Sequence, residues 1–219
     1  MAKQKKKLGR KFYFSVEGET EKWYLEWLQK EINAHIENEK ITFEIKVQKD
    51  PRQFVKSFSN ISAVTITHLY DYEGDSPAQV QTFRKTMDHM KDAEGMKSVR
   101  YRMGYSNLTF ELWMILHKMN HTASHINQNQ YLRFINQAYN ETFMKLDAYK
   151  EEDNFKRLLG KLKLDNVLTA ITNAKTIQQN NQRAGYQEER YKGFTYYRAN
   201  PALSIHERIE ELLKEVGIL

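Results

Sequence analysis

The stretch KFYFSVEGETEKWYLEWLQKEINAHI, residues 11–36, decides the fold class of this chain. Residues 11–16 are rich in aromatic side chains and predict a strand, whereas Thr20–Ile36 repeats apolar residues near the helical period of 3.6. Gly18 allows a sharp turn of the backbone between the two segments. A strand that leads directly into a helix favours a layered α/β fold.

Strands and helices continue to alternate up to about residue 120. Further strands are expected over 41–47, 63–70 and 97–103, and helices over 51–59, 77–93 and 107–118. This order with short connections predicts a mainly parallel sheet flanked by helices. Beyond residue 120 the pattern predicts helices only, over 129–139, 155–162, 165–182 and 201–216. We therefore expect an α/β domain over 11–120 and a mainly helical extension over 121–219.

The charge balance of the chain favours an anionic partner. The 219 residues carry a formal net charge of +6, and six of the first eleven residues are Lys or Arg. Residues 1–10 are predicted to be a flexible basic arm, because like charges in a block repel one another. Nucleic acid is the usual partner of a basic protein, although the same charge also serves solubility.

Several classes of protein are excluded or disfavoured by composition. The chain has no cysteine, which excludes disulfides, thiolate zinc sites and cysteine nucleophiles. It has no apolar run near the roughly 18 residues of a membrane span and no signal peptide, so we expect a cytoplasmic protein without membrane contact. It also lacks a phosphate-binding P-loop, a His-Glu-x-x-His motif and a Gly-x-Ser-x-Gly elbow.

Two acidic segments follow predicted strands, Glu17–Glu21 after the first and Asp71–Asp75 after the third. Ligands of parallel sheets bind beyond the carboxyl ends of the strands, so these carboxylates are expected on one edge. Unpaired, they would repel one another, and a hard cation such as Mg²⁺ or Mn²⁺ would relieve the repulsion. Such a cation can neutralise a phosphate and activate water.

Helix starts provide the alternative interpretation of these acids. Glu19 and Glu21 would suit the positive end of a helix dipole, and Asp75 could cap the helix predicted to begin near residue 77. This alternative leaves Glu17, Asp71 and Glu73 unexplained. These three are the expected metal-facing acids.

Three further segments carry candidate site residues. Asn107 is a good helix cap, and Glu111 lies one helical turn further on the same face as the cap, where a capping box does not explain it. His117 and His206 could approach a phosphate, although buried histidines are commonly structural. Residues 186–198 interleave tyrosines with cations. Such a stretch could bind nucleic acid through Arg190, Lys192 and Arg198, or could be a hairpin packed on the domain.

Taken together, these segments resemble the RloB-like family, whose members have a Toprim-type domain and occur near bacterial restriction and phage-defence loci. The resemblance rests on Glu17-Gly18-Glu19-Thr20-Glu21, on the Asp71–Asp75 run, and on Ser106–Trp113 followed by His117. An Asn-Pro pair at position 200 and His206 complete it. Leu108 replaces the proline expected there, and Glu73 stands where aspartate is common.

This resemblance implies a Toprim fold and a Mg²⁺-dependent endonuclease of anti-phage defence that acts on DNA or RNA, with tRNA among the candidates. It implies Glu17 as metal-linked acid or general base, Asp71 and Glu73 as ligands with Asp75 in reserve, and Glu111 as a further acid. Asn107, His117 and His206 would position phosphate or water. The alternatives are a non-catalytic sensor or adaptor that binds nucleic acid or protein, and a nucleotidyl transferase. Control by a regulatory protein or a larger defence complex is also expected.

Overall fold

A computed structural model describes residues 8–37, 39–58 and 63–219 of the chain. Its first half contains β1 (Leu8–Val16), α1 (Glu19–His35), β2 (Glu39–Val47), α2 (Pro51–Lys56), β3 (Val64–Asp71), α3 (Pro77–Met96), β4 (Val99–Asn107) and α4 (Glu111–Leu116). Its second half contains η1 (Gln128–Tyr131), α5 (Leu132–Tyr139), α6 (Leu146–Lys150), α7 (Glu152–Leu159), α8 (Leu164–Arg183), β5 (Glu188–Tyr191), β6 (Phe194–Tyr197), β7 (Ala202–Leu203) and α9 (Ile205–Glu215).

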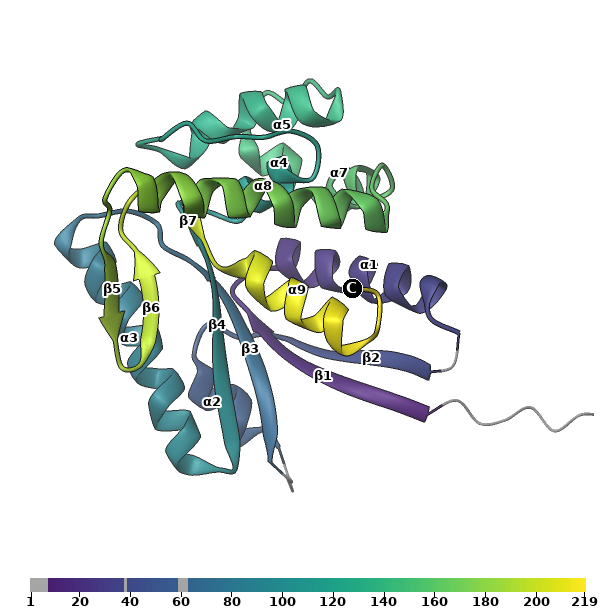
Figure 1. Cartoon of the computed structure of the whole chain (residues 1–219), viewed down its shortest axis with the longest axis vertical. Helices are drawn as coiled ribbons and strands as arrows, with labels where there is room; N and C mark the ends of the chain where they lie inside the picture. Colours follow the sequence, from purple (N-terminus) through teal and green to yellow (C-terminus); the bar gives the residue numbers. More distant parts are fainter. Residues whose placement is uncertain (1–7, 38, 59–62) are drawn as a thin grey trace, which may run out of the picture.

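The central sheet has the strand order β2-β1-β3-β4-β7 and confirms the predicted α/β class (Figure 1). The first four strands pair in parallel, and β7 pairs antiparallel with the end of β4. β1 pairs with β2 along its whole length, but with β3 only over Tyr13–Val16. The two strand pairs therefore diverge towards their amino ends, which gives the sheet its curl (Figure 1).

Helices cover both faces of the sheet. On one face, α1 and the helices of the second half enclose the larger apolar core, which includes Phe14, Val16 and Leu69 from the strands. On the other face, α2, α3 and the β5–β6 hairpin pack on Ile66, Tyr70 and other strand residues (Figure 1). Strands buried on both faces explain why β1 and β3 are apolar runs at the ends that carry the acids.

Helix α1 shows how the sequence directs this packing. Its buried residues Glu21, Tyr24, Leu25, Leu28 and Ile32 follow the helical period, with Tyr24 and Leu25 adjacent, and form one face. α3 is defined locally, because Ser76 and Gln79 form a capping box with proline at the first turn. Among the described helices, none is long and apolar enough to cross a lipid bilayer.

The structure corrects the predicted boundary between the fourth strand and the helix after it. β4 extends to Asn107, and α4 begins only at Glu111, so Asn107 is not a helix cap. Asn107 lies opposite Ala202 in the sheet, and its amide donates hydrogen bonds to the carbonyls of Arg198 and Ala199. The Asn107–Leu108 and Asn200–Pro201 peptide bonds are cis.

The chain ends also differ from expectation. Most of the predicted basic arm, residues 1–7, lies outside the described residues, and residues 8–10 belong to β1. The expectation of helices only after residue 120 is wrong, because the β5–β6 hairpin and β7 interrupt them and α9 begins at Ile205. The hairpin packs on α3, where Arg84 pairs with Glu189 and Tyr196, so the hairpin interpretation of residues 186–198 holds.

The packing of α1 generates a stability prediction. Ile32 is fully buried, so Ile32→Ala should lower the free energy of unfolding by about 2–5 kcal/mol through lost burial and a cavity. Ile126 is 93% exposed, and Ile126→Ala should change it by less than ~0.5 kcal/mol. Urea unfolding followed by circular dichroism measures both. Equal effects of the two variants would contradict the packing described for α1.

Candidate functional site

An acidic pocket with a volume of about 320 Å³ lies at the carboxyl ends of β1 and β3. Glu17 directly follows β1, Asp71 is the last residue of β3, and Glu111 is the first residue of α4. Two lysines, Lys49 and Lys150, enter the same pocket. The complete lining consists of Glu17, Gly18, Glu19, Thr20, Glu21, Lys49, Asp71, Glu73, Thr109, Phe110, Glu111, Gln128 and Lys150.

Parallel pairing of β1 with β3 brings the first two acids together. Val16 lies opposite Leu69 in the register, so the loop after β1 passes beside the end of β3. The backbone N–H of Asp71 donates to Glu17 Oε2 at 3.2 Å. The edge of the sheet therefore fixes Glu17 and Asp71 as neighbours, as predicted from the strand ends.

Burial dominates the electrostatics of these acids. It raises the pKa of Glu17 to about 7, with nearby Glu21 adding to the shift. It also raises the pKa of Asp71 well above its usual range, with Glu21 and Glu111 as the next causes. The pKa of Glu21 rises mainly through burial too, although the Thr20 hydroxyl donates to its Oε2 at 2.7 Å. Each carboxylate resists ionisation because several negative groups share one desolvated site.

Glu111 completes the pocket from the side of α4. It is 2% exposed, and its Oε1 lies 3.1 Å from Lys150 Nζ. Its Oε2 is buried and has no hydrogen-bond partner within the described part of the chain. A buried carboxylate oxygen without a donor is costly, so this atom marks a place where a cation or a donor would stabilise the protein.

The acids at positions 73 and 75 have different surroundings. Glu73 is exposed and lies on the rim of the acidic pocket. Asp75 is not part of the pocket lining, because its carboxylate binds Arg198 and accepts a hydrogen bond from the Tyr72 hydroxyl. The Arg198 side chain lowers the pKa of Asp75. Glu73 and Asp75 are the two candidates for the second metal ligand. Within the described part of the chain, Glu73 lines the pocket and Asp75 does not.

Three predicted site residues lie in the protein interior and do not line the pocket. His117 Nδ1 lies 2.8 Å from the Trp113 carbonyl, and its Nε2 lies 3.1 Å from the Tyr24 hydroxyl. Burial lowers the pKa of His117 and of His206 to about 4, so both are neutral near pH 7. Asn107 is 1% exposed and binds backbone carbonyls. Hydrogen bonds hold His117 and Asn107 inside the protein, whereas the buried His206 Nδ1 has no partner among the described residues.

The predicted nucleic-acid-binding cations belong to or follow the hairpin. Arg190 and Lys192 are exposed there, with Lys192 Nζ 3.9 Å from Asp88. Arg198 is already paired with Asp75 and Glu189. Among the tyrosines of this stretch, Tyr196 and Tyr197 are 1% and 8% exposed, whereas Tyr186 is 53% exposed.

The sequence pattern explains Glu21 as a helix-start residue and does not indicate Lys49 or Lys150 as site residues. Glu21 carried a usable signal, because it lies on the same helical face as Tyr24, Leu25 and Leu28 and therefore had to point inwards. No signal in the sequence indicates Lys150, since its place depends on how α6 of the extension brings it to Glu111 of α4.

The chemistry of the acidic pocket fits a hard divalent cation bound partly by other ligands. Within the described residues no group of three His, Asp or Glu side chains stands ready to hold a metal ion. Mg²⁺, however, commonly uses one or two carboxylates and takes water and substrate phosphates as its other ligands. The unpartnered Glu111 Oε2 and the raised pKa values of Glu17 and Asp71 are consistent with such a site.

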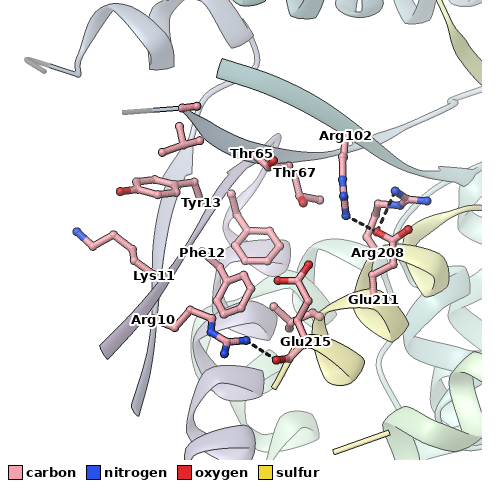
Figure 2. Close-up of a pocket in the computed structure, with 14 residues that line it drawn as sticks. Arg10, Lys11, Phe12, Tyr13, Thr65, Thr67, Arg102, Arg208, Glu211 and Glu215 are labelled. Carbon is pink, nitrogen blue, oxygen red and sulfur yellow. Dashed lines mark hydrogen bonds and ion pairs between the residues drawn. The ribbon is translucent and has the colours of Figure 1, made fainter. Parts of the chain in front are cut away.

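A second pocket, of about 260 Å³, lies towards the amino ends of the strands, where β1 and β3 diverge (Figure 2). Arg10, Arg102 and Arg208 line it, but Glu211 binds both Arg102 and Arg208, and Arg10 binds the Glu215 carbonyl, while the Lys11 ammonium points away and pairs with Glu44 (Figure 2). None of the predicted site residues lines this pocket. It has no part in the acidic site.

The fold and the pocket define an α/β protein with a carboxylate site at the carboxyl edge of a mostly parallel sheet. The sequence profile of the RloB-like protein family matches residues 12–212, so the chain belongs to that family, as the sequence motifs predicted. Neither the curated proteins nor the solved structures gave a match.

The raised pKa of Glu17 gives a prediction about stability and pH. With a pKa near 7 in the folded protein and near 4.5 when unfolded, Glu17 favours folding below about pH 4.5 and loses that contribution as pH rises through 7. In EDTA at pH 8, Glu17→Gln should therefore raise the melting temperature. Because solvent screens the pocket, we expect a shift of about 2–4 °C, corresponding to roughly 1 kcal/mol.

The difference should shrink towards pH 5, where the wild-type carboxyl is protonated. Glu19→Gln is the matched control, since Glu19 is exposed in the same segment. A pH-independent shift in Glu17→Gln, or the same profile in Glu19→Gln, would contradict a desolvated Glu17.

Proposed function

We propose that this protein is a Mg²⁺- or Mn²⁺-dependent nuclease that hydrolyses phosphodiester bonds of nucleic acid at the acidic pocket. The observation that carries the proposal is the convergence of Glu17, Asp71 and Glu111 in one pocket at the carboxyl edge of the sheet. Family membership and the formal net charge of +6 support it. A phosphate substrate would meet a negative pocket, so a cation between them is required.

The bound cation would neutralise the phosphate and make water more acidic. Asp71 and Glu73 are the proposed ligands, and Glu111 offers its unpartnered Oε2. Glu17, which lies beside Asp71 in the pocket, is the proposed acceptor of a proton from water. The backbone N–H of Asp71 donates to the Glu17 carboxylate and holds it in place.

The nucleic acid would approach across a neighbouring pocket of about 400 Å³, which shares Glu17, Lys49, Asp71 and Glu73 with the acidic one. Lys49 and Lys85 line this neighbouring pocket and supply cations beside the carboxylates. Phosphates flanking the cut would contact these lysines, while the reacting phosphate lies at the acids.

The setting we propose is anti-phage defence in the bacterial cytoplasm, with DNA or RNA, including tRNA, as substrate. A nuclease of this kind needs restraint, and a regulatory protein or larger defence complex would supply it. The support is the resemblance described above together with the family match.

Replacing the proposed catalytic acids tests this function. Glu17→Gln and Asp71→Asn should each lower cleavage of DNA, total RNA or tRNA by roughly 100-fold or more in Mg²⁺ or Mn²⁺. Asp75→Asn is the matched control in the same loop, because Asp75 binds Arg198 outside the pocket, and it should retain most activity. Unchanged cleavage by both pocket variants would refute this site.

A non-catalytic sensor that binds nucleic acid is the second candidate, favoured by the absence of a preformed group of three metal ligands among the described residues. It predicts salt-dependent binding with no cleavage under any divalent metal. Labelled-nucleotide incorporation would instead indicate a nucleotidyl transferase.

The approach of the nucleic acid can be tested separately from cleavage. Lys49→Ala with Lys85→Ala should weaken binding and lower the slope of log K against log salt by about 1 for each lysine that contacts phosphate. Arg190→Ala with Lys192→Ala is the comparison pair, and it should change the slope little. A larger effect of the second pair in fluorescence anisotropy would move the interface to the hairpin.

A further inference from the structure

Lys150 is the cation that faces the buried acids of the pocket. It is the last residue of α6, which belongs to the second half of the chain, whereas the acids come from the first half. Its Nζ lies 3.1 Å from Glu111 Oε1, and its charge also acts on Glu21 and Asp71. One ammonium group thus balances three acids that come from α1, β3 and α4.

This ion pair satisfies only one side of the Glu111 carboxylate. Glu111 lines the pocket and is 2% exposed, and its buried Oε2 has no hydrogen-bond partner within the described part of the chain. The Lys150 side chain is 40% exposed, so it can reach solvent without repacking of the core. The Glu111 carboxylate is enclosed by the protein, whereas the Lys150 side chain borders solvent.

We propose that Lys150 is a displaceable counter-cation, which holds Glu111 in the metal-free protein and gives up its position when a divalent cation binds. The inference rests on the proposed metal site but not on cleavage. A lysine ammonium and a divalent cation compete for the same carboxylate charge, because close like charges repel strongly in a partly buried pocket. The extension thereby sets the affinity of the site for metal.

Lys150→Met tests this, because it keeps the length of the apolar stem and removes the charge. Isothermal titration calorimetry with Mn²⁺ alone should show about tenfold tighter binding than to the wild type, as expected for loss of one nearby cation in a solvent-open pocket. Lys150→Arg keeps the charge and should bind Mn²⁺ within a few-fold of the wild type. Glu111→Gln should bind Mn²⁺ more weakly.

Lys49→Met is the matched control, since Lys49 lines the same pocket and acts on Glu17 without an ion pair to Glu111. It should tighten Mn²⁺ binding less than Lys150→Met does. Equal tightening would show a general charge effect and would overturn the proposal. Unchanged or weaker Mn²⁺ binding by a folded Lys150→Met, judged by circular dichroism, would overturn it as well.

The same measurements separate this inference from the proposed nuclease. If Mn²⁺ affinity rises in Lys150→Met but no form cleaves nucleic acid, the role of Lys150 as a counter-cation is supported and the proposed nuclease activity is refuted. If Lys150→Met weakens binding of nucleic acid and leaves Mn²⁺ affinity unchanged, Lys150 contacts phosphate and the proposal is wrong. Failure of every form to bind Mn²⁺ also overturns it.

Discussion

The burial of several carboxylates at one edge of the sheet is the constraint on which the rest of this structure depends. Glu17, Glu21, Asp71 and Glu111 share one pocket, and burial raises the pKa values of Glu17, Glu21 and Asp71. Folding alone would favour apolar residues at these positions, because desolvated charges are expensive. The protein tolerates the cost through a backbone N–H at Glu17, a hydroxyl at Glu21 and a lysine at Glu111. Natural proteins retain such cost mainly where function requires it.

The extension is part of the site and not an independent appendage. Gln128 and Lys150 come from η1 and α6, yet both line the acidic pocket. β7 pairs with the end of β4, and α9 packs on β4, so the last helix also returns to the sheet. The boundary near residue 120 therefore marks a change in the sequence pattern, whereas the residues on its two sides pack together around one pocket.

The sequence predicted what depends on local patterns and missed what depends on contacts distant in the chain. The strands and helices up to residue 96, and the meeting of Glu17 with Asp71, follow from alternation and from the geometry of parallel strands. The extension of β4 to Asn107 depends on the pairing of residues 104–106 with β3 and of the last two residues with β7 about a hundred residues later, which no local pattern indicates. His117 is a candidate by resemblance for positioning phosphate or water, but its ring contacts the Trp113 carbonyl and the hydroxyl of Tyr24, which lies on another helix. The place of Lys150 likewise depends on tertiary packing.

The short pairing between β1 and β3 has a mechanical consequence. In the described part of the chain, four residues on each strand, Tyr13–Val16 and Ile66–Leu69, join the β2-β1 half of the sheet to the β3-β4-β7 half. Glu17 and Asp71 lie at the end of this seam, one on each half. A ligand bound to both acids would link the two halves of the sheet across this seam. The two halves would then separate less readily. Ligand binding at the pocket would thus make the whole sheet more rigid, because a ligand stabilises the state to which it binds.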